Sequence, residues 1–278
     1  MLAAIWLLFR LFWFLLRPAE LYFAGCILLL NGSEPTHEAM KNVKLFFLLA
    51  GLTAASCSPK FYSPNTQNVP LITEQGQFSL NVNGGGGGQV GFQGAVGLTD
   101  AIAVQVNGGL FIPGELDNGN GGSGNFAEGG VGFYRPIGSS FVFETYGLFG
   151  FGRFENHLPS TMDQYPGTSG KMSGNILRYG FQPNLGFVTK YFTIAVSSRL
   201  VLLDYYNIDG NLTFEDADQV AYLKDNRSSF LLEPALTIRG GVEKVKLQLQ
   251  VGTSVNVTNS DFRQDKGFAT IGLNFNLK

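Results

Sequence analysis

The chain has 278 residues, of which 45% are hydrophobic and only 14% charged, and its formal net charge is −2. Soluble proteins average about 25% charged residues, and disordered chains are far less apolar and aromatic than this one. No excess of basic residues is present to neutralise phosphates, so we expect no nucleic-acid partner. Two cysteines, Cys26 and Cys57, cannot supply a disulfide framework or a zinc site, and we expect no metal and no cofactor.

The first 39 residues contain an apolar stretch that charged residues and a proline interrupt. Neither half of that stretch reaches the roughly 20 apolar residues of a membrane-spanning helix. A better-formed signal begins at Met40, with two lysines, a short apolar region over 45–52 and small residues over 53–56. This is the layout of a secretory signal peptide. Two export signals in series make little physical sense, so we expect residues 1–39 to be an upstream extension and 40–56 to be the signal peptide. An inner-membrane anchor is the alternative for residues 1–39.

Cys57 directly follows the small residues of that signal. Residues 40–57 therefore resemble a bacterial lipoprotein signal, in which the cysteine becomes the acylated first residue of the mature chain. One departure is Ala54, where the family prefers leucine or a similar residue. The resemblance implies lipidation of Cys57, and an ordinary signal peptide cut nearby is the alternative. Residues 57–75 are then a lipidated N-terminus followed by an extended linker, because residues 58–75 are polar and hold three prolines.

From Gly76 onward apolar residues alternate with polar or small ones, so that every second residue is of the same kind. In residues 245–257 one parity is almost entirely apolar and the other is polar or small, which is typical of a strand with two unlike faces. Most of these segments have the nine or more residues that cross a bilayer as a tilted strand. Ten segments follow this pattern, at 76–84, 88–98, 101–111, 125–135, 140–154, 174–188, 191–204, 227–239, 242–257 and 267–278.

The connections between these segments alternate in length. Short turns alternate with long polar stretches at 112–124, 155–173, 205–226 and 258–266. Short turns on one side and long loops on the other are the signature of an outer-membrane barrel. An even number of strands places both termini on the short-turn, periplasmic side, which suits an acyl anchor at Cys57 in the inner leaflet.

The composition of the two parities favours a membrane barrel over a soluble β-sandwich. The polar parity holds small and amide residues where a sandwich would show many lysines and glutamates, and small residues suit an enclosed lumen. A chain in hydrocarbon without helices must close on itself to satisfy its backbone. We therefore predict an all-β fold, a closed antiparallel up-and-down transmembrane β-barrel of about ten strands over residues 76–278, with eight or twelve strands as alternatives. Aromatic residues near predicted strand ends are expected to form interfacial girdles: Phe111, Tyr134, Phe141, Phe154, Tyr191, Tyr205 and Tyr206.

The last five residues, Asn274 to Lys278, resemble the C-terminal strand of outer-membrane barrels, although Phe275 lies short of the terminal position that the family prefers for its aromatic residue. Over about residues 76–278 the chain resembles small bacterial outer-membrane β-barrel proteins of the OmpA-like and OmpX-like kind. The resemblance implies a bacterial outer-membrane location, with membrane lipids and the outer-membrane insertion machinery as partners. The family's functions are too varied to transfer. Pro183 and Pro234 fall inside predicted strands, where we expect β-bulges.

The predicted register turns seven charged side chains toward the lumen. Ionised groups in a narrow space of low dielectric constant must pair, or each costs several kcal/mol. We therefore expect a plug of paired charges, as in small barrels that side chains fill. A narrow channel or a binding site for a small solute is the alternative. The seven residues are Glu128, Glu144, Arg178, Arg199, Glu233, Arg239 and Lys246.

The loops offer little chemistry. The acidic stretch 205–226 matches no calcium-loop spacing, so we expect it to be solvated. Enzymatic activity is not expected, because a surface hydrolase would have to be built on His157 and Asp163 without recognisable companions. The preferred function is an outer-membrane barrel with a structural or surface-interaction role. A solute channel or binder comes second and a surface hydrolase third, and the extracellular partner or solute stays unspecified.

Overall fold

The computed structural model describes residues 59–112, 121–158 and 166–277. The expected upstream extension, the signal peptide and Cys57 lie outside the described residues. None of the helices in the described part of the chain has the length and hydrophobicity that a membrane-crossing helix requires.

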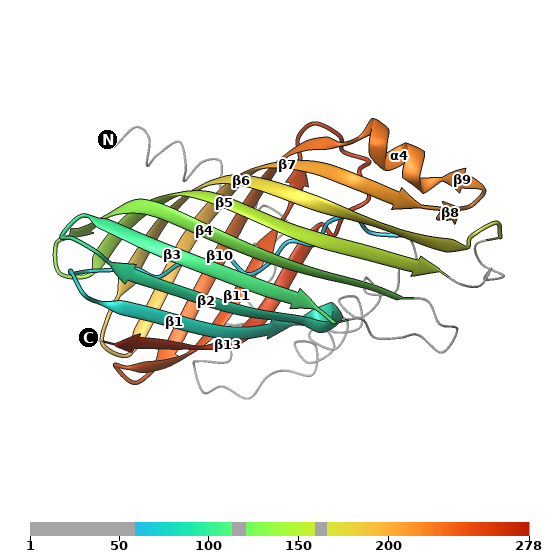
Figure 1. Cartoon of the computed structure of the whole chain (residues 1–278). Coiled ribbons are helices and arrows are strands. Elements are labelled where there is room, and N and C mark those ends of the chain that lie inside the picture. Colours follow the sequence, from blue (N-terminus) through green and yellow to red (C-terminus); the bar gives the residue numbers. More distant parts are fainter. Residues whose placement is uncertain (1–58, 113–120, 159–165, 278) are drawn as a thin grey trace, which may run out of the picture. The chain divides into compact units, whose positions relative to one another are not determined.

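Ten long strands form one closed antiparallel barrel (Figure 1). Neighbours in sequence pair with each other around the barrel, and β1 pairs with β13 to close it. The predicted fold class and strand number are confirmed. The short β12, Val255–Asn256, continues the line of β11, because both pair with β10 in the same register. The ten strands are β1 Phe78–Gly85, β2 Gln89–Gly97, β3 Ile102–Phe111, β4 Gly121–Ile137, β5 Phe141–Leu158, β6 Gly170–Val188, β7 Phe192–Gly210, β10 Ser228–Gly241, β11 Val245–Thr253 and β13 Gly267–Leu277.

The two ends of the barrel differ. The short-turn end carries the tight connections β2–β3, β4–β5, β6–β7 and β10–β11, and the loop end carries the remaining connections. Strands β4 to β7 extend further toward the loop end than their alternation predicts, since the pairing continues to Gly121↔His157 and Leu158↔Gly170. The backbone hydrogen bonds between these strands therefore continue beyond the residues in which apolar and polar side chains alternate. At the loop end lie the hairpin of β8 (Thr213–Phe214) and β9 (Ala217–Asp218) and the helix α4 (Gln219–Asp225).

The two strand prolines cause no register shift. Phe181↔Leu200 and Asn184↔Ser197 share one register on either side of Pro183. On the two sides of Pro234, Leu232↔Val255 and Ala235↔Gly252 likewise share one. The expectation of bulges at these prolines is wrong. Each proline lies where the ladder to one neighbouring strand skips two residues, so its missing N–H is accommodated without an extra residue in the strand.

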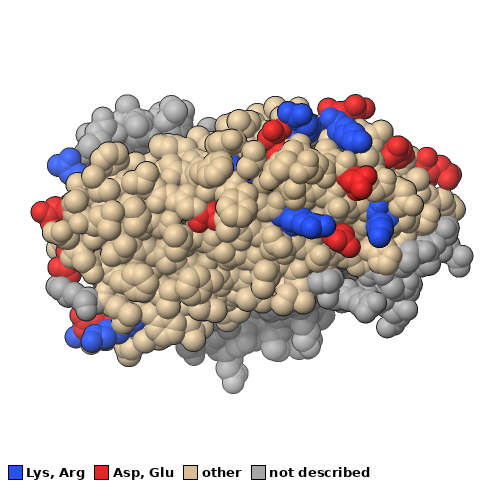
Figure 2. Space-filling model, viewed as in Figure 1, with Lys and Arg blue, Asp and Glu red and all other residues tan. Residues whose placement is uncertain are grey.

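The outward face of the barrel is apolar and the inward face is polar. On β11, Val245, Leu247, Leu249 and Val251 are 37–55% exposed, whereas Lys246, Gln248 and Gln250 are at most 2% exposed. Much of the surface in Figure 2 is uncharged, and most of its charged side chains gather toward the two ends of the barrel. This distribution is the reverse of a soluble protein's and matches a barrel that faces lipid.

The expected aromatic girdles are only partly present. Phe141, Tyr191 and Tyr206 are exposed on the outer surface. Tyr134, Phe154 and Tyr205 are buried instead, and the prediction is wrong for them. Proximity to a strand end placed these three correctly along the barrel axis, but their parity turns them inward.

Candidate functional site

The interior of the barrel is occupied by the chain's own N-terminal segment. Residues 59–72, which we call the plug segment, run in extended form from the loop end to the short-turn end (Figure 1). At the loop end the backbone N–H of Phe61 donates to the carbonyl of Arg263, at 2.9 Å. Beyond the other end of the plug, the N–H of Gly76 donates to the carbonyl of Gly97, at 2.8 Å. The side chains of Phe61, Gln67 and Ile72 are almost completely buried.

The composition of the plug segment explains why it can lie in such an interior. The sequence predicts a linker over residues 58–75, whereas the structure places residues 59–72 inside the barrel. Its prolines, Pro59, Pro64 and Pro70, favour an extended backbone and bring no N–H groups that need partners. The stretch Asn65 to Asn68 supplies amide and hydroxyl groups that can pair with a polar lumen.

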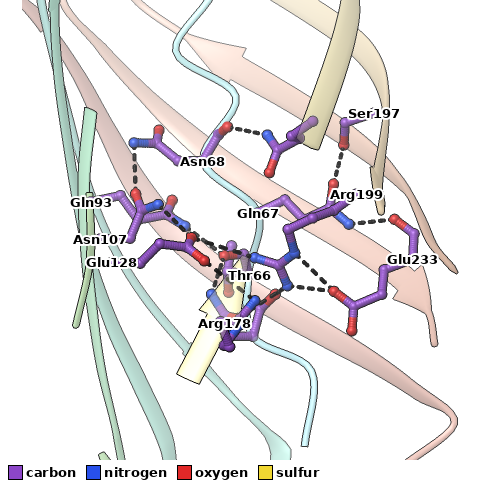
Figure 3. Close-up of polar contacts among 12 residues, drawn as sticks. Thr66, Gln67, Asn68, Gln93, Asn107, Glu128, Arg178, Ser197, Arg199 and Glu233 are labelled. Carbon is purple, nitrogen blue, oxygen red and sulfur yellow. Dashed lines mark hydrogen bonds and ion pairs between the residues drawn. The ribbon is translucent and has the colours of Figure 1, made fainter. Parts of the chain in front are cut away.

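Four of the predicted lumen charges form one cluster around the middle of the plug segment (Figure 3). Arg199 makes two contacts with Glu233, Nη2 to Oε2 at 2.7 Å and Nε to Oε2 at 2.8 Å. Glu128 lies 3.6 Å from Arg178 and 3.9 Å from Arg199. The side-chain oxygen of Asn65 accepts from both arginines, at 2.8 and 3.0 Å. The plug segment therefore bridges the charged groups of the wall.

Amide groups lock the same region of the plug segment to the strands around it. Gln67 is bonded through its backbone and its side chain: its N–H donates to Gln250 Oε1 at 2.6 Å, and its Oε1 accepts from Ser197 at 2.7 Å. The neighbouring contacts are Gln93 Nε2 to the Thr66 carbonyl, Thr66 Oγ1 to Asn83 Oδ1 and Asn68 Nδ2 to Asn107 Oδ1, at 2.7 to 2.9 Å.

At the short-turn end the plug segment packs against small residues of the wall. Glu144 accepts from the backbone N–H of Ile72 at 2.7 Å, and Arg239 donates to the carbonyl of Val69 at 2.6 Å. A Cβ atom at Gly97 would lie 2.7 Å from the carbonyl oxygen of Glu74 and 2.9 Å from Ile72. Position 97 must therefore be glycine, because the chain around Ile72 and Glu74 passes too close for a larger side chain.

An aromatic cluster covers the loop end. Phe61 lies 5.9–6.1 Å from the rings of Phe154, Tyr222 and Phe262, measured between ring centroids. Tyr222 belongs to α4, whose first turn is capped by Asp218 through the N–H groups of Val220 and Ala221. The helix and hairpin of this loop therefore fold down onto the start of the plug segment.

The structure places all seven predicted lumen charges in the interior, each at most 5% exposed. Four pair in the central cluster, Glu144 and Arg239 hold the plug segment, and Lys246 donates to Thr189 and Thr193 at 2.8 and 3.0 Å. The plug segment, and Asn65 within it, were not predicted from the sequence. The available signal was the abundance of Asn, Gln and Thr in both the segment and the polar parity.

The other sequence candidates are not assembled into a site. His157 is exposed near the end of β5, and Asp163 lies outside the described residues. Among the described residues, no group of three or more His, Cys, Asp and Glu side chains is placed to hold a metal ion. A crevice of about 150 Å³ lies between the plug segment and β4 to β6, with Tyr62, Phe126 and Arg178 among its lining residues.

Together these features define a closed β-barrel with an apolar outer face and an interior filled by its own chain. No protein-family model and no curated protein matches the sequence. Among solved structures, LpxR from Salmonella typhimurium is 10% identical, over 72% of this chain and 99% of its own, with a TM-score of 0.32. The translocator domain of the autotransporter NalP from Neisseria meningitidis is 11% identical, over 72% of this chain and 86% of its own, with a TM-score of 0.39. A major outer membrane protein from Thermus thermophilus is 13% identical, over 72% of this chain and 99% of its own, with a TM-score of 0.34. At these identities and TM-scores the likeness adds no argument about this chain's role, which must come from its own residues.

Proposed function

We propose that this protein is a bacterial outer-membrane barrel that is closed to solutes by its own plug segment and that acts through the surface at its loop end. The observation that carries the proposal is the complete burial of the central plug residues against both sides of the wall. Gln67 is bonded to Gln250 and Ser197, on strands β11 and β7. Its neighbours Thr66 and Asn68 are bonded to Gln93 and Asn107, on strands β2 and β3 across the lumen. A solute would have to displace this segment and break the ion pairs around it.

An outer-membrane location is supported by the apolar outer face and by the export signal that precedes it. Membrane lipids are then the partners of the outer face, and the outer-membrane insertion machinery is the partner during assembly. Long loops face the exterior in bacterial barrels, so the loop end with α4 is proposed as the extracellular, structural or partner-binding surface.

Reconstitution into planar lipid bilayers tests the closed interior. The full chain should insert without giving a stable conductance. A lasting conductance in the nanosiemens range would contradict a closed barrel and favour the channel. Orientation and insertion can be checked in the same samples by protease digestion of the loops.

Acylation of Cys57 is part of the same proposal and is supported by the sequence signal. Cells fed an alkyne-bearing fatty acid should incorporate it into the parent protein and not into Cys57→Ala. Equal incorporation into both proteins, or none into the parent, would show that the cysteine is not the anchor.

A small-solute binder is a second candidate, which the crevice favours. Arg178 lines the crevice and is 4% exposed. Its Nη1 donates to Asn65 and its Nη2 lies 3.6 Å from Glu128, but neither Nε nor Nη2 makes a hydrogen bond among the described residues. A guanidinium so placed would select a small anion. Addition of benzoate should raise the melting temperature of the parent more than that of Arg178→Lys if this site binds carboxylates. Catalysis is not part of the proposal.

A further inference from the structure

The plug segment has a definite direction through the barrel. Its first residues lie at the loop end, where the side chain of Asn156 donates to the carbonyl of Lys60 at 2.9 Å. Asn156 lies near the last residue of β5, a strand that begins at the short-turn end. The plug segment then passes the central ion pairs and reaches the level of Gly97, after which β1 begins at Phe78.

The described chain therefore enters the barrel at the loop end, where Pro59 and Lys60 lie. Cys57 is two residues away, and two residues of extended chain span at most about 7 Å. We propose that the N-terminus of the mature protein is displayed on the loop-bearing face of the barrel, opposite its C-terminus. An acyl group on Cys57 would then lie on the side of the outer leaflet of the outer membrane and not on the side of the inner one. This inference rests on the proposed function for the membrane orientation and for the acylation.

The packing of the interior supports this single passage of the chain. To return Cys57 to the short-turn side, the residues before Pro59 would have to run back through the lumen beside the plug segment. Gln67, Arg199 and Glu233 are each 0% exposed in the middle of the barrel. The lumen at that level is already filled by one segment and the side chains bonded to it, so it has no room for a second.

The loop end holds the start of the plug segment in place. Phe61 is 1% exposed within the aromatic cluster, and Tyr205 donates to its carbonyl oxygen at 3.1 Å. Tyr62 donates to Glu233 at 2.8 Å. These contacts hold Phe61 and Tyr62, at the start of the plug segment, at a fixed place in the loop end of the barrel.

Three matched lysine-to-cysteine variants test the inference in intact cells. Lys60→Cys probes the exit of the plug segment, Lys224→Cys probes the exposed surface of α4, and Lys244→Cys probes a short turn at the opposite end. A membrane-impermeant maleimide is applied before and after permeabilisation of the outer membrane. The parent chain measures the background from Cys57, whose sulfur is blocked if it is acylated.

The inference predicts that half-buried Lys60→Cys is labelled in intact cells without permeabilisation, as exposed Lys224→Cys is, and that exposed Lys244→Cys is labelled at least tenfold more weakly than Lys224→Cys until permeabilisation. Labelling of Lys60→Cys only after permeabilisation, with Lys224→Cys labelled beforehand, would overturn it. So would Lys60→Cys that reacts only after heat unfolding. If Lys224→Cys is labelled only after permeabilisation, the loop end does not face the exterior. Both the proposed orientation and the display of the N-terminus on the cell surface are then wrong. A labelled parent would refute the acylation of Cys57 and leave the direction of the plug segment to be judged by Lys60→Cys.

Discussion

Arg199 illustrates how this interior tolerates charge at the scale of single residues. Its guanidinium group is fully buried, and it contacts Glu233, Glu128 and both oxygens of Asn65. A buried ion is costly unless its partner and further hydrogen bonds compensate the lost hydration. Two strands and the plug segment provide these partners, so the charge also ties the wall to the plug.

Replacement of Glu233 by leucine should expose the cost of that charge. Glu233→Leu leaves Arg199 without its closest carboxylate, and removal of one partner of a buried pair costs about 3–5 kcal/mol. The free energy of unfolding, measured by urea titration in detergent, should fall by that amount. Glu243→Gln, which removes the exposed pair with Lys190, serves as the control and should change it by less than about 1 kcal/mol. Equal effects of the two substitutions would contradict a buried, coupled Arg199.

Gly97 tests the close approach at the short-turn end. Gly97→Ala would place a methyl group 2.7 Å from the carbonyl oxygen of Glu74, a backbone atom that cannot rotate away. Overpacking of this kind typically costs about 1–3 kcal/mol, which should appear as a lower melting temperature of the barrel. Gly240→Ala, whose new methyl group would meet no atom within 4 Å, is the matched control. A Gly97→Ala protein as stable as Gly240→Ala would show that the chain does not pack there.

The wall of the interior could be predicted from the sequence residue by residue, because strand parity alone decides which side chains face inward. That argument assigns Glu128, Arg199 and Lys246 to the lumen. It fails for Asn65, whose segment has no periodicity. Tyr134 and Tyr205 were misassigned on their proximity to strand ends and not on parity, because aromatic rings suit either a girdle or a filled interior.

At the scale of elements, the plug segment distinguishes this barrel from an open one. Its sequence has the polar and proline-rich composition of a linker, and no periodic pattern within residues 59–72 shows that they are buried. Burial is imposed by the barrel, whose lumen has a size and a set of hydrogen-bonding groups that an extended chain can satisfy. The strands, by contrast, show the alternation of apolar and polar residues in their own sequences. All ten were therefore predictable, and most of their ends were predictable to within a few residues.

Weakening the plug segment should open the barrel to ions. Replacing Asn65, Thr66, Gln67 and Asn68 with glycine and serine removes the side chains that bind both sides of the wall, and the segment should then leave the lumen transiently. Planar-bilayer recordings should show current steps that the parent lacks. Gln75→Ser, at an exposed residue beyond the plug segment, should stay silent. A four-residue variant as silent as its parent would show that the segment does not control passage.

At the scale of the whole molecule, the barrel combines an apolar outside with a polar inside. A closed barrel satisfies its backbone groups internally, which is the condition for crossing hydrocarbon. The outer band of valine, leucine and phenylalanine supplies the contact with lipid, and the plug segment fills the space that closure creates. In the proposed orientation, the outer leaflet, the loop end and the start of the plug segment lie on the same side.

The contact between the outer face and lipid tails can be measured with a single tryptophan. Both tryptophans of the chain, Trp6 and Trp13, lie before Met40, so a chain that is cut at the proposed signal has none. Leu249 is 48% exposed in the middle of β11, and Val257 is 60% exposed toward the loop end. In liposomes, Leu249→Trp should be quenched most strongly by lipids brominated deep in the acyl chain, and Val257→Trp by lipids brominated near the headgroup. Unquenched, water-like emission from Leu249→Trp would contradict a membrane-spanning barrel.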